Sequence, residues 1–386
     1  MRQIWVVDDD RSIRWVLEKA LTRAQMPFRL FESAADVVKA FEHDTPSVLL
    51  SDIRMHDMSG LDLLAFVKNK YPGLPVIIMT AFSDLDSAVS AFQGGAYEYL
   101  AKPFDINSAI DLLRRAREES TVAESTDASD LDDKGTERRT EIIGQSRAMQ
   151  EVFRAIGRLS HSHVTVLLTG ESGTGKEVVA RALHQHSLRS RAPFVAINTA
   201  AIPRELLESE LFGHERGAFT DAYESRPGKF EAANGSSLFM DEIGNLSIAL
   251  QAKLLTVLQN RNVTRIGSNK VIPVDIRLIS ATNKDIPEMV KQGLFREDLF
   301  YRINTIHLEI PPLRERGDDI LLFIDTFLRR FTSKYQRPDI RMHEQTIEKL
   351  RSYHWPGNIR ELRNVIERLI ILSEERITLD DVKTYC

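Results

Sequence analysis

Cysteine, tryptophan and long apolar runs are scarce in this sequence. Its 386 residues include one cysteine, Cys386, and three tryptophans. A single cysteine allows no internal disulfide, which fits a reducing compartment. No apolar run approaches the ~18 residues that a membrane-spanning helix needs, and the N-terminus has no signal-peptide pattern. We therefore expect a cytoplasmic protein without a membrane segment.

A strong excess of charge is absent as well. The formal net charge is -5, with 42% hydrophobic and 28% charged residues. This balance excludes a global basic field that would draw the chain onto nucleic acid or anionic lipid, although a local basic patch stays possible. At about 100–200 residues per domain, the length predicts two or three domains.

Short apolar segments alternate with amphipathic helices over the first 117 residues. Apolar runs of this length, bounded by polar turns, are typical of buried parallel strands, and the alternation predicts a doubly wound α/β sheet. Residues 118–140 are polar and acidic and predict a flexible linker. The expected strands are Ile4–Val7, Phe28–Phe31, Val48–Ser51, Val76–Met79 and one near Tyr97–Leu100, with helices such as Ile13–Arg23 and Gly60–Lys70 between them.

A second α/β pattern begins at Glu141. From Ile320 to the end, the pattern predicts helices only. The expected strands of this second region are Val164–Leu168, Phe194–Asn198, Ser237–Met240 and Ile276–Ser280.

Acidic, hydroxyl and basic side chains follow successive strands of the first sheet. Asp8 and Asp9 follow the first strand, Asp52 and Thr80 end later ones, and Lys102 follows the last. Carboxyl ends of parallel strands share one edge, so we expect these groups to converge there. Clustered carboxylates suit Mg²⁺, and a carboxylate beside Mg²⁺ and lysine can attack phosphorus. For a single Asp, a solvated charge at a strand end would be the better interpretation, but the whole set favours a site.

The central region carries a phosphate-binding loop, which we call the P-loop. The segment follows an apolar strand and opens a helix, as this motif requires. Its glycines let backbone N–H groups surround phosphates, and Lys176 is expected to reach the β- and γ-phosphates. Glu177 stands where Ser or Thr usually binds Mg²⁺, so Thr174 or water would have to take that role. The predicted nucleotide-binding residues of the loop are Gly170, Glu171, Ser172, Gly173, Thr174, Gly175, Lys176 and Glu177.

Downstream residues complete the expected ATP site. The apolar strand Ser237–Met240 is followed by Asp241, predicted to hold Mg²⁺, and Glu242, predicted to polarise the attacking water. Alone, this segment would be interpreted as a core strand that ends in a capping acid. Thr282 and Asn283 end the next strand, where they can sense the γ-phosphate.

Three arginines and one phenylalanine are further candidates. Arg296 and Arg302 are either solvated or supplied as arginine fingers to a neighbouring subunit. Arg360 begins a helix after a Pro-Gly break and could fold over the nucleotide. Phe219 lies among small residues, which favours an exposed binding anchor over a buried turn aromatic.

The first 117 residues resemble the receiver domains of NtrC-family two-component response regulators. The resemblance rests on Trp5–Asp10, Ser51–Met55 and Ala101–Phe104. It implies that Asp52 accepts phosphate from a sensor histidine kinase and that Asp8 and Asp9 hold Mg²⁺. It also implies phosphoryl contacts by Thr80 and Lys102, and a switch role for Tyr99. His56-Asp57 departs from the Pro-Gly of the family pattern.

Residues 141–375 resemble the AAA+ domain of sigma-54-dependent transcription activators. The resemblance rests on Glu208–Glu215, Phe295–Arg302, Pro311–Arg316, Trp355–Leu362 and the loop of Gly217, Ala218, Phe219, Thr220, Asp221 and Ala222. It implies a hexameric or heptameric ring with ATP between subunits, and Arg296 and Arg302 acting in trans. Asn198 would couple Glu242 to a moving loop, and Arg360 would be a second sensor. The Gly217–Ala222 loop would grip sigma-54, although Asp221 replaces a glycine of the family pattern.

Together these features predict a flavodoxin-like receiver over 1–117, a linker over 118–140, an AAA+ α/β domain over 141–310 and a helical lid over 311–386. The expected function is a phosphorylation-controlled ATPase, an inactive dimer that becomes a ring and remodels sigma-54 RNA polymerase. The alternatives are an AAA+ remodeller of another protein and an ATP-binding scaffold without turnover. We find no helix-turn-helix and expect no sequence-specific DNA binding by this chain. Nitrogen-related regulation is suggested only by the resemblance.

Overall fold

The computed structural model describes residues 3–80, 90–92, 94–120, 144–160, 162–219, 222–337, 340–373 and 376–385. It divides into two compact units, Met1–Glu141 and Ile142–Cys386. The predicted linker lies almost entirely outside the described residues, as do Thr220 and Asp221. Across the parts of the chain that are described, no helix combines the length and apolarity needed to cross a membrane.

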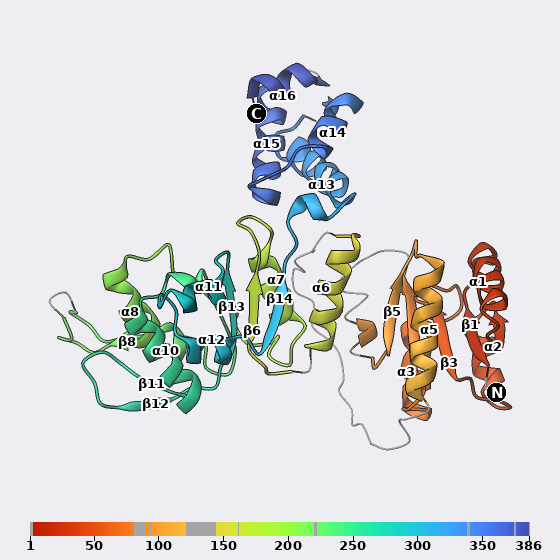
Figure 1. The fold of residues 1–386 in the computed structure, drawn as a ribbon, viewed down its shortest axis with the longest axis horizontal. Helices are drawn as coiled ribbons and strands as arrows, with labels where there is room; N and C mark the ends of the chain where they lie inside the picture. Colours follow the sequence, from red (N-terminus) through yellow and green to blue (C-terminus); the bar gives the residue numbers. More distant parts are fainter. Residues whose placement is uncertain are drawn as a thin grey trace. The chain divides into compact units, whose positions relative to one another are not determined.

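The N-terminal unit is a five-stranded sheet in the order β2-β1-β3-β4-β5, with every neighbouring pair parallel. This is the doubly wound arrangement that the sequence predicts (Figure 1). The elements are β1 (Ile4–Val7), α1 (Arg11–Arg23), β2 (Phe28–Phe31), α2 (Ala34–Ala40), β3 (Val48–Asp52), α3 (Gly60–Lys70), β4 (Val76–Thr80), β5 (Glu98–Ala101) and α5 (Ile106–Ser120).

Alternate residues of these strands enter two different cores, as the two-residue period of a strand requires. Trp5 and Val7 pack with α2 and α3 on one face, while Ile4 and Val6 pack with α1 and α5 on the other. Because both faces are covered, β1, β3 and β4 are buried along their whole length. The polar residues that follow these strands therefore emerge at the edge of the sheet, where a site can form.

The second unit contains another all-parallel sheet, in the order β14-β6-β13-β10-β7. Its strands are β6 (Val166–Thr169), β7 (Val195–Asn198), β10 (Ser237–Asp241), β13 (Arg277–Thr282) and β14 (Ile306–Glu309). The helices around it include α6 (Arg147–Arg158), α7 (Lys176–Gln185), α8 (Arg204–Phe212), α9 (Lys229–Ala232), α10 (Ile248–Asn260), α11 (Ile286–Lys291) and α12 (Glu297–Ile303). Two short antiparallel pairs, β8 (Gly213–His214) with β9 (Arg226–Pro227) and β11 (Asn262–Thr264) with β12 (Val271–Pro273), complete it.

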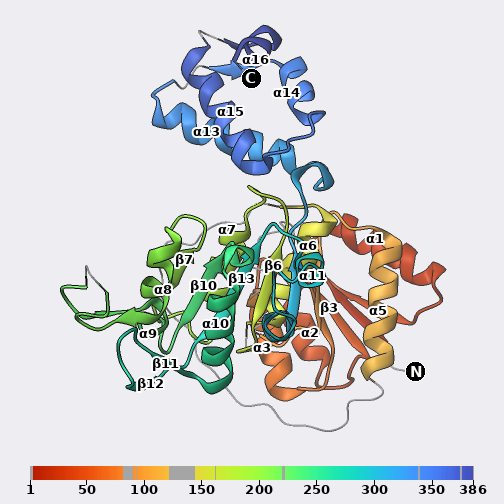
Figure 2. The ribbon, with the colours of Figure 1, turned by 60° about the vertical axis from the view of Figure 1, so that its left-hand side comes forward.

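The lid follows β14 and a short turn, η2 (Leu313–Glu315). Figure 2 shows its helices gathered in one bundle, in blue. They are α13 (Asp319–Lys334), α14 (Glu344–Arg351), α15 (Asn358–Leu372) and α16 (Leu379–Tyr385), packed around a core that includes Phe331, Trp355 and Ile366.

The expectation of helices only after Ile320 is wrong in one respect. Two strands of two residues each, β15 (Arg341–Met342) and β16 (Arg376–Ile377), form a parallel pair inside the lid. The N–H of His343 extends the pair by donating to Ile377 at 3.0 Å. A pairing this short leaves no alternation in the sequence, so the pattern cannot reveal it.

Candidate functional site

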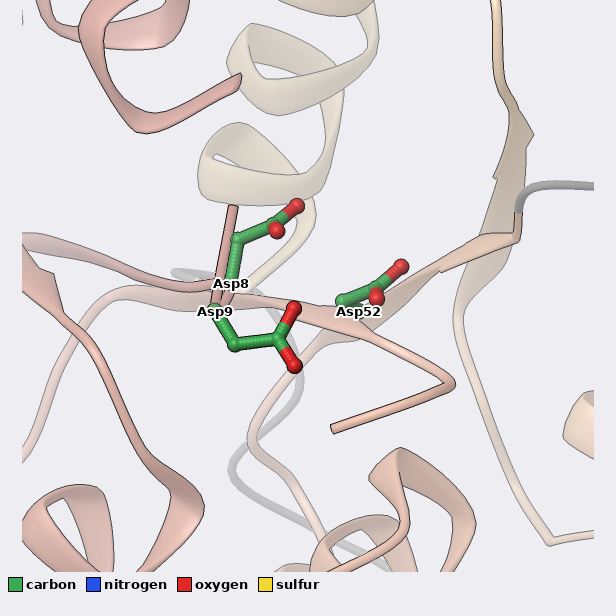
Figure 3. A group of neighbouring side chains, drawn as sticks. All are labelled: Asp8, Asp9 and Asp52. Atoms are coloured by element: carbon green, nitrogen blue, oxygen red, sulfur yellow. The ribbon is translucent and has the colours of Figure 1, made fainter. Parts of the chain in front are cut away.

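Three carboxylates meet where β1 and β3 end. Asp8 and Asp9 follow β1, and Asp52 is the last residue of β3; the register pairs Val7 with Ser51, which brings Asp8 beside Asp52. The candidate ligand oxygens of the three residues lie within 4.8 Å of one another, and Figure 3 shows the side chains together. Asp8 and Asp52 are buried, and Asp9 is partly exposed. The predicted convergence is therefore present.

Lys102 lies between two of these carboxylates. Its Nζ is 2.6 Å from Asp8 Oδ2 and 2.8 Å from Asp52 Oδ1. Its backbone N–H donates to Thr80 at 2.7 Å, which fixes it beside the end of β4. Burial raises the pKa of Asp8, although the hydrogen bond from Lys102 opposes that shift. The single positive charge of Lys102 therefore offsets only part of the negative charge of the three carboxylates, which favours the binding of a further cation.

Thr80 and Tyr99 occupy neighbouring strands. Thr80 ends β4 at the same sheet edge and is 3% exposed. Tyr99, on β5, is almost fully buried, and its ring meets that of Phe92 edge-on at 5.9 Å. The structure thus brings Asp8, Asp9, Asp52 and Lys102 together in one cluster. Thr80 and Tyr99 lie on the adjacent strands β4 and β5.

Two contacts of this site were not predicted from the sequence. Arg14 on α1 is buried, and its Nη1 donates to the carbonyl oxygens of Asp8 at 2.7 Å and Asp9 at 3.0 Å. His56 Nδ1 contacts the carboxylate of Asp9. The first could have been suspected from an arginine placed one turn into a helix that follows the acidic pair. The second involves the position where the sequence departs from the family pattern.

In the second unit, the P-loop joins β6 to α7. Gly170, Gly173 and Gly175 have φ values of 145°, 80° and 101°, conformations that glycine adopts at little cost. Lys176, the first residue of α7, is 7% exposed, and its Nζ donates to the carbonyl oxygens of Gly170 at 2.8 Å and Glu171 at 3.0 Å. Burial lowers the pKa of Lys176. The loop thus has the curled backbone and buried lysine of a phosphate cradle.

Asp241 and Glu242 stand at the end of β10. Asp241 Oδ2 accepts a hydrogen bond from Asn198 Nδ2 at 3.1 Å, across the register that pairs these residues. Burial raises the pKa of Asp241, and the nearby charge of Lys176 opposes that shift. Glu242 has φ 58°, in the left-handed region, and its carbonyl oxygen accepts from Thr199 Oγ1 at 2.7 Å. Strained non-glycine residues of this kind concentrate at functional sites.

The other residues predicted to bind the nucleotide differ in their burial and in their partners. Thr282 is fully buried at the end of β13, and Asn283 after it is exposed. Thr174 is buried and donates its hydroxyl to the carbonyl of Glu171 at 2.9 Å. The carboxylate of Glu177 pairs with Arg181 at 2.8 Å on the outer face of α7.

The three predicted arginines have different surroundings. Arg296 precedes α12 and pairs with Asp298 at 2.7 Å. Arg302 is exposed near the end of the same helix and donates to the carbonyl of Leu258 at 3.0 Å. Arg360 on α15 belongs to the lid, and its Nη1 donates to Ser172 Oγ of the P-loop at 2.9 Å.

The predicted binding loop lies between β8 and β9 in the sequence, and its residues Gly217–Phe219 and Ala222 are described. Gly217, with φ 81°, donates its N–H to the carbonyl of Ala222 at 2.8 Å, and Ala222 is buried. Phe219 is 37% exposed, and its ring lies 4.9 Å from the ring of His214. The loop is therefore closed at its base and carries a partly exposed aromatic. Ala218 packs closely against Gly267, since a Cβ added to Gly267 would lie 2.9 Å from the Cβ of Ala218.

Comparisons with known proteins show the family to which the chain belongs. Three family models match in succession: a response regulator receiver domain over residues 4–114, a sigma-54 interaction domain over 142–309 and an AAA+ ATPase lid domain over 314–386. The DNA-binding transcriptional regulator NtrC of Proteus hauseri is 50% identical over 374 residues, which cover 96% of this chain and 78% of that protein. NtrC of Escherichia coli (strain K12) is 50% identical over 370 residues with the same coverage. The chain belongs to the NtrC family of response regulators.

A solved structure supports the fold along most of the chain. The crystal structure of NtrX from Brucella abortus is 32% identical, with a TM-score of 0.59, and the match covers 98% of this chain and 85% of that one. NtrX has also been solved in complexes with ADP and with ATP. The predicted fold class is confirmed. This NtrC-family chain is a two-component response regulator with a nucleotide-binding, sigma-54-activating AAA+ ATPase domain.

Proposed function

We propose that phosphorylation of Asp52 by a cognate sensor histidine kinase controls ATP hydrolysis by the second unit. The observation that carries this proposal is the position of Lys102, between Asp52 at 2.8 Å and Asp8 at 2.6 Å. The Asp52 carboxylate attacks the phosphorus of the phosphohistidine; the phosphorus–nitrogen bond breaks and an acyl phosphate forms. Lys102 would then balance charge on the phosphoryl oxygens. The Thr80 hydroxyl, at the end of the neighbouring strand β4, would bind one of them.

Asp8, Asp9 and Asp52 would hold Mg²⁺ at this site. The donor set fits, because carboxylate oxygens within 4.8 Å of one another are the ligands that Mg²⁺ prefers. Bound there, the ion would neutralise the repulsion between the acidic cluster and the incoming phosphoryl group. Arg14 holds the backbone of Asp8 and Asp9 in place through their carbonyl oxygens. Tyr99 would report phosphorylation to the rest of the unit through its buried ring.

The experiment compares the wild-type chain with Asp52→Asn, each with and without beryllofluoride and ATP. Oligomer size by light scattering and the rate of phosphate release are both measured. In the wild type, beryllofluoride should change both quantities, whereas Asp52→Asn should not respond because the acceptor carboxylate is gone. Asp111→Asn, an exposed acid on α5, is the control with the same change of charge. An equal response in Asp52→Asn and wild type would refute the proposal.

In the ATPase unit, the P-loop backbone binds the phosphates and Lys176 supplies a positive charge to them. Asp241 would hold Mg²⁺, and the Glu242 carboxylate would take a proton from the attacking water. Asn198, which now contacts Asp241, is proposed to couple Glu242 to moving segments. Thr282 and Asn283 would sense the γ-phosphate, and Arg360 would contact it from the lid.

The output of hydrolysis is proposed to act on sigma-54 RNA polymerase through the Gly217–Ala222 loop. The partly exposed ring of Phe219 supports this role, because an exposed aromatic beside small residues is a typical binding anchor. An inactive dimer would assemble into an active hexamer or heptamer, with Arg296 and Arg302 completing the site of a neighbour. The likeness to the transcriptional regulator NtrC leads us to propose a cytoplasmic, nitrogen-related role for this chain.

A further inference from the structure

The acid within the P-loop has an unexpected set of partners. Glu171 follows the first glycine of the loop, where a negative charge would repel a triphosphate. Its carboxylate is bound to the lid: Oε1 is 2.6 Å from Arg314 Nη2, and Oε2 is 2.9 Å from Arg314 Nη1. Asn358 Nδ2 also donates to Oε2, at 3.0 Å. We call these contacts among Glu171, Arg314 and Asn358 the clasp.

Asn358 joins the clasp to the backbone on both sides. It is fully buried, with a left-handed φ of 52°. Its Nδ2 donates to the carbonyl of Ser172 at 3.1 Å, and its Oδ1 accepts from the N–H of Leu313 at 2.8 Å. One asparagine therefore connects the P-loop, the turn η2 and the start of α15. A buried side chain that satisfies partners on three segments fixes their relative position.

The backbones of lid and P-loop also touch directly. The N–H of Ile359 donates to the carbonyl of Gly173 at 3.1 Å. A Cβ built on Gly173 would lie 2.3 Å from the carbonyl oxygen of Gly357 and 3.1 Å from Cβ of Arg360. Nothing larger than glycine fits between the two segments. The position of Arg360, two residues after Asn358, is therefore tied to the P-loop.

We propose that Glu171 is a positioning residue that fastens the lid to the P-loop through Arg314 and Asn358 and thereby sets where Arg360 meets the nucleotide. The inference rests on the nucleotide contact proposed for Arg360. Bidentate pairing by an arginine fork fixes orientation as well as distance, which a lysine cannot do. Hydrogen bonds from Arg314 and Asn358 lower the pKa of Glu171 to about 2, so the carboxylate stays charged near neutral pH.

The clasp should affect catalysis more than stability. The side chains of Arg314 and Glu171 are 38% and 41% exposed, and ion pairs this accessible to water add little to folding stability. A misplacement of about 1 Å at a reacting group, in contrast, can lower a rate by on the order of a hundredfold. Loss of the clasp should therefore reduce kcat while leaving the melting temperature near that of the wild type.

The test uses the full chain and measures kcat and KM for ATP, the affinity for a fluorescent ADP analogue, and thermal unfolding. The variants are Glu171→Gln, Arg360→Ala and their combination. Arg314→Lys is a second way to weaken the clasp, since it keeps the charge and loses the fork. Glu315→Gln is the matched control: this exposed acid lies 3.8 Å from the same arginine but belongs to the lid.

Glu171→Gln and Arg314→Lys should each lower kcat roughly tenfold, while Glu315→Gln behaves as wild type. Because the effect runs through Arg360, adding Glu171→Gln to Arg360→Ala should cause no further loss. Additive losses, or an unchanged kcat in Glu171→Gln, would overturn the clasp while leaving the role of Arg360 intact. If Arg360→Ala itself changes neither kcat nor ADP affinity, the proposed contact of Arg360 is wrong and the positioning role falls with it.

Discussion

At the scale of single residues, Glu242 combines a strained backbone with a carboxylate at the end of β10. Its left-handed φ of 58° costs on the order of 1 kcal/mol or more for a residue with a side chain. Glu242→Gln keeps this backbone and removes only the charge that would accept a proton. We expect phosphate release to fall by about a hundredfold or more, with ATP affinity close to wild type.

The measurement is coupled phosphate release beside titration with a fluorescent ATP analogue. Glu205→Gln, an exposed acid in the first turn of α8, is a control with the same chemical change. Unchanged phosphate release in Glu242→Gln would remove the general base from the proposed mechanism and would favour a scaffold that binds ATP without turnover.

Two residues that support the sites, Arg14 and Asn358, were not among the candidate residues predicted from the sequence. Asp8, Asp52, Lys176 and Asp241 could be predicted because each directly follows an apolar strand or a glycine-rich turn. Arg14 has one weak signal in the sequence, its position one turn into the helix that follows the acidic pair, and many surface arginines share such a position. Asn358 was hidden, because its contact with Glu171 spans 187 positions of the chain and leaves no local pattern.

At the scale of secondary structure, the strands of the first sheet were the easiest to predict. The bounds of β1 and β2 agree with the expectation, and β3 and β4 each extend one residue further. The edge strand β14 was not predicted. It is short, and its residues Ile306–Glu309 alternate between partly buried and exposed, so the sequence has no continuous apolar run there. β15 and β16 were missed because tertiary contacts within the lid, and not a local preference, pair them.

The contact between the P-loop and the start of α15 makes a prediction for Gly173. Gly173→Ala places a Cβ 2.3 Å from the carbonyl oxygen of Gly357, so the lid must move away from the loop. We expect ATP turnover to fall at least tenfold, on the basis of the rate cost of a displacement of about 1 Å. Gly235→Ala is the control for backbone strain alone, since its φ of 76° is close to the 80° of Gly173 and nothing lies within 4 Å of the added Cβ.

Turnover and thermal unfolding of the two alanine variants are compared with wild type. Each should lose stability by roughly 1 kcal/mol because of the left-handed conformation. Only Gly173→Ala should lose activity. Equal activity losses in both variants would mean that strain, and not the clash with the lid, is responsible.

At the scale of the whole molecule, the surface positions of Arg296 and Arg302 suggest that a complete ATPase site needs two chains. Arg302 donates only to a backbone carbonyl among the contacts described, and Arg296 pairs with the acid two residues later. Arg302 is exposed and Arg296 is partly exposed, and arginines at the two ends of one helix are well placed to meet a neighbouring subunit. An arginine finger supplied in trans is worth a factor of about a thousand or more in kcat.

Mixing two inactive variants tests this arrangement directly. Arg302→Ala keeps its own Asp241 and Glu242 but offers no finger, whereas Glu242→Gln offers the finger but cannot activate water. If the finger acts in trans in a ring with one repeated interface, an equimolar mixture should restore about one functional interface in four.

Phosphate release is measured for each variant and for the mixture at the same total concentration, with beryllofluoride present. Arg302→Ala mixed with wild type serves to confirm that the variant enters the assembly. A mixture that co-assembles yet stays as inactive as its components would show that Arg302 serves its own chain or has no part in hydrolysis, because only transfer between subunits can pair an intact Glu242 with an intact Arg302.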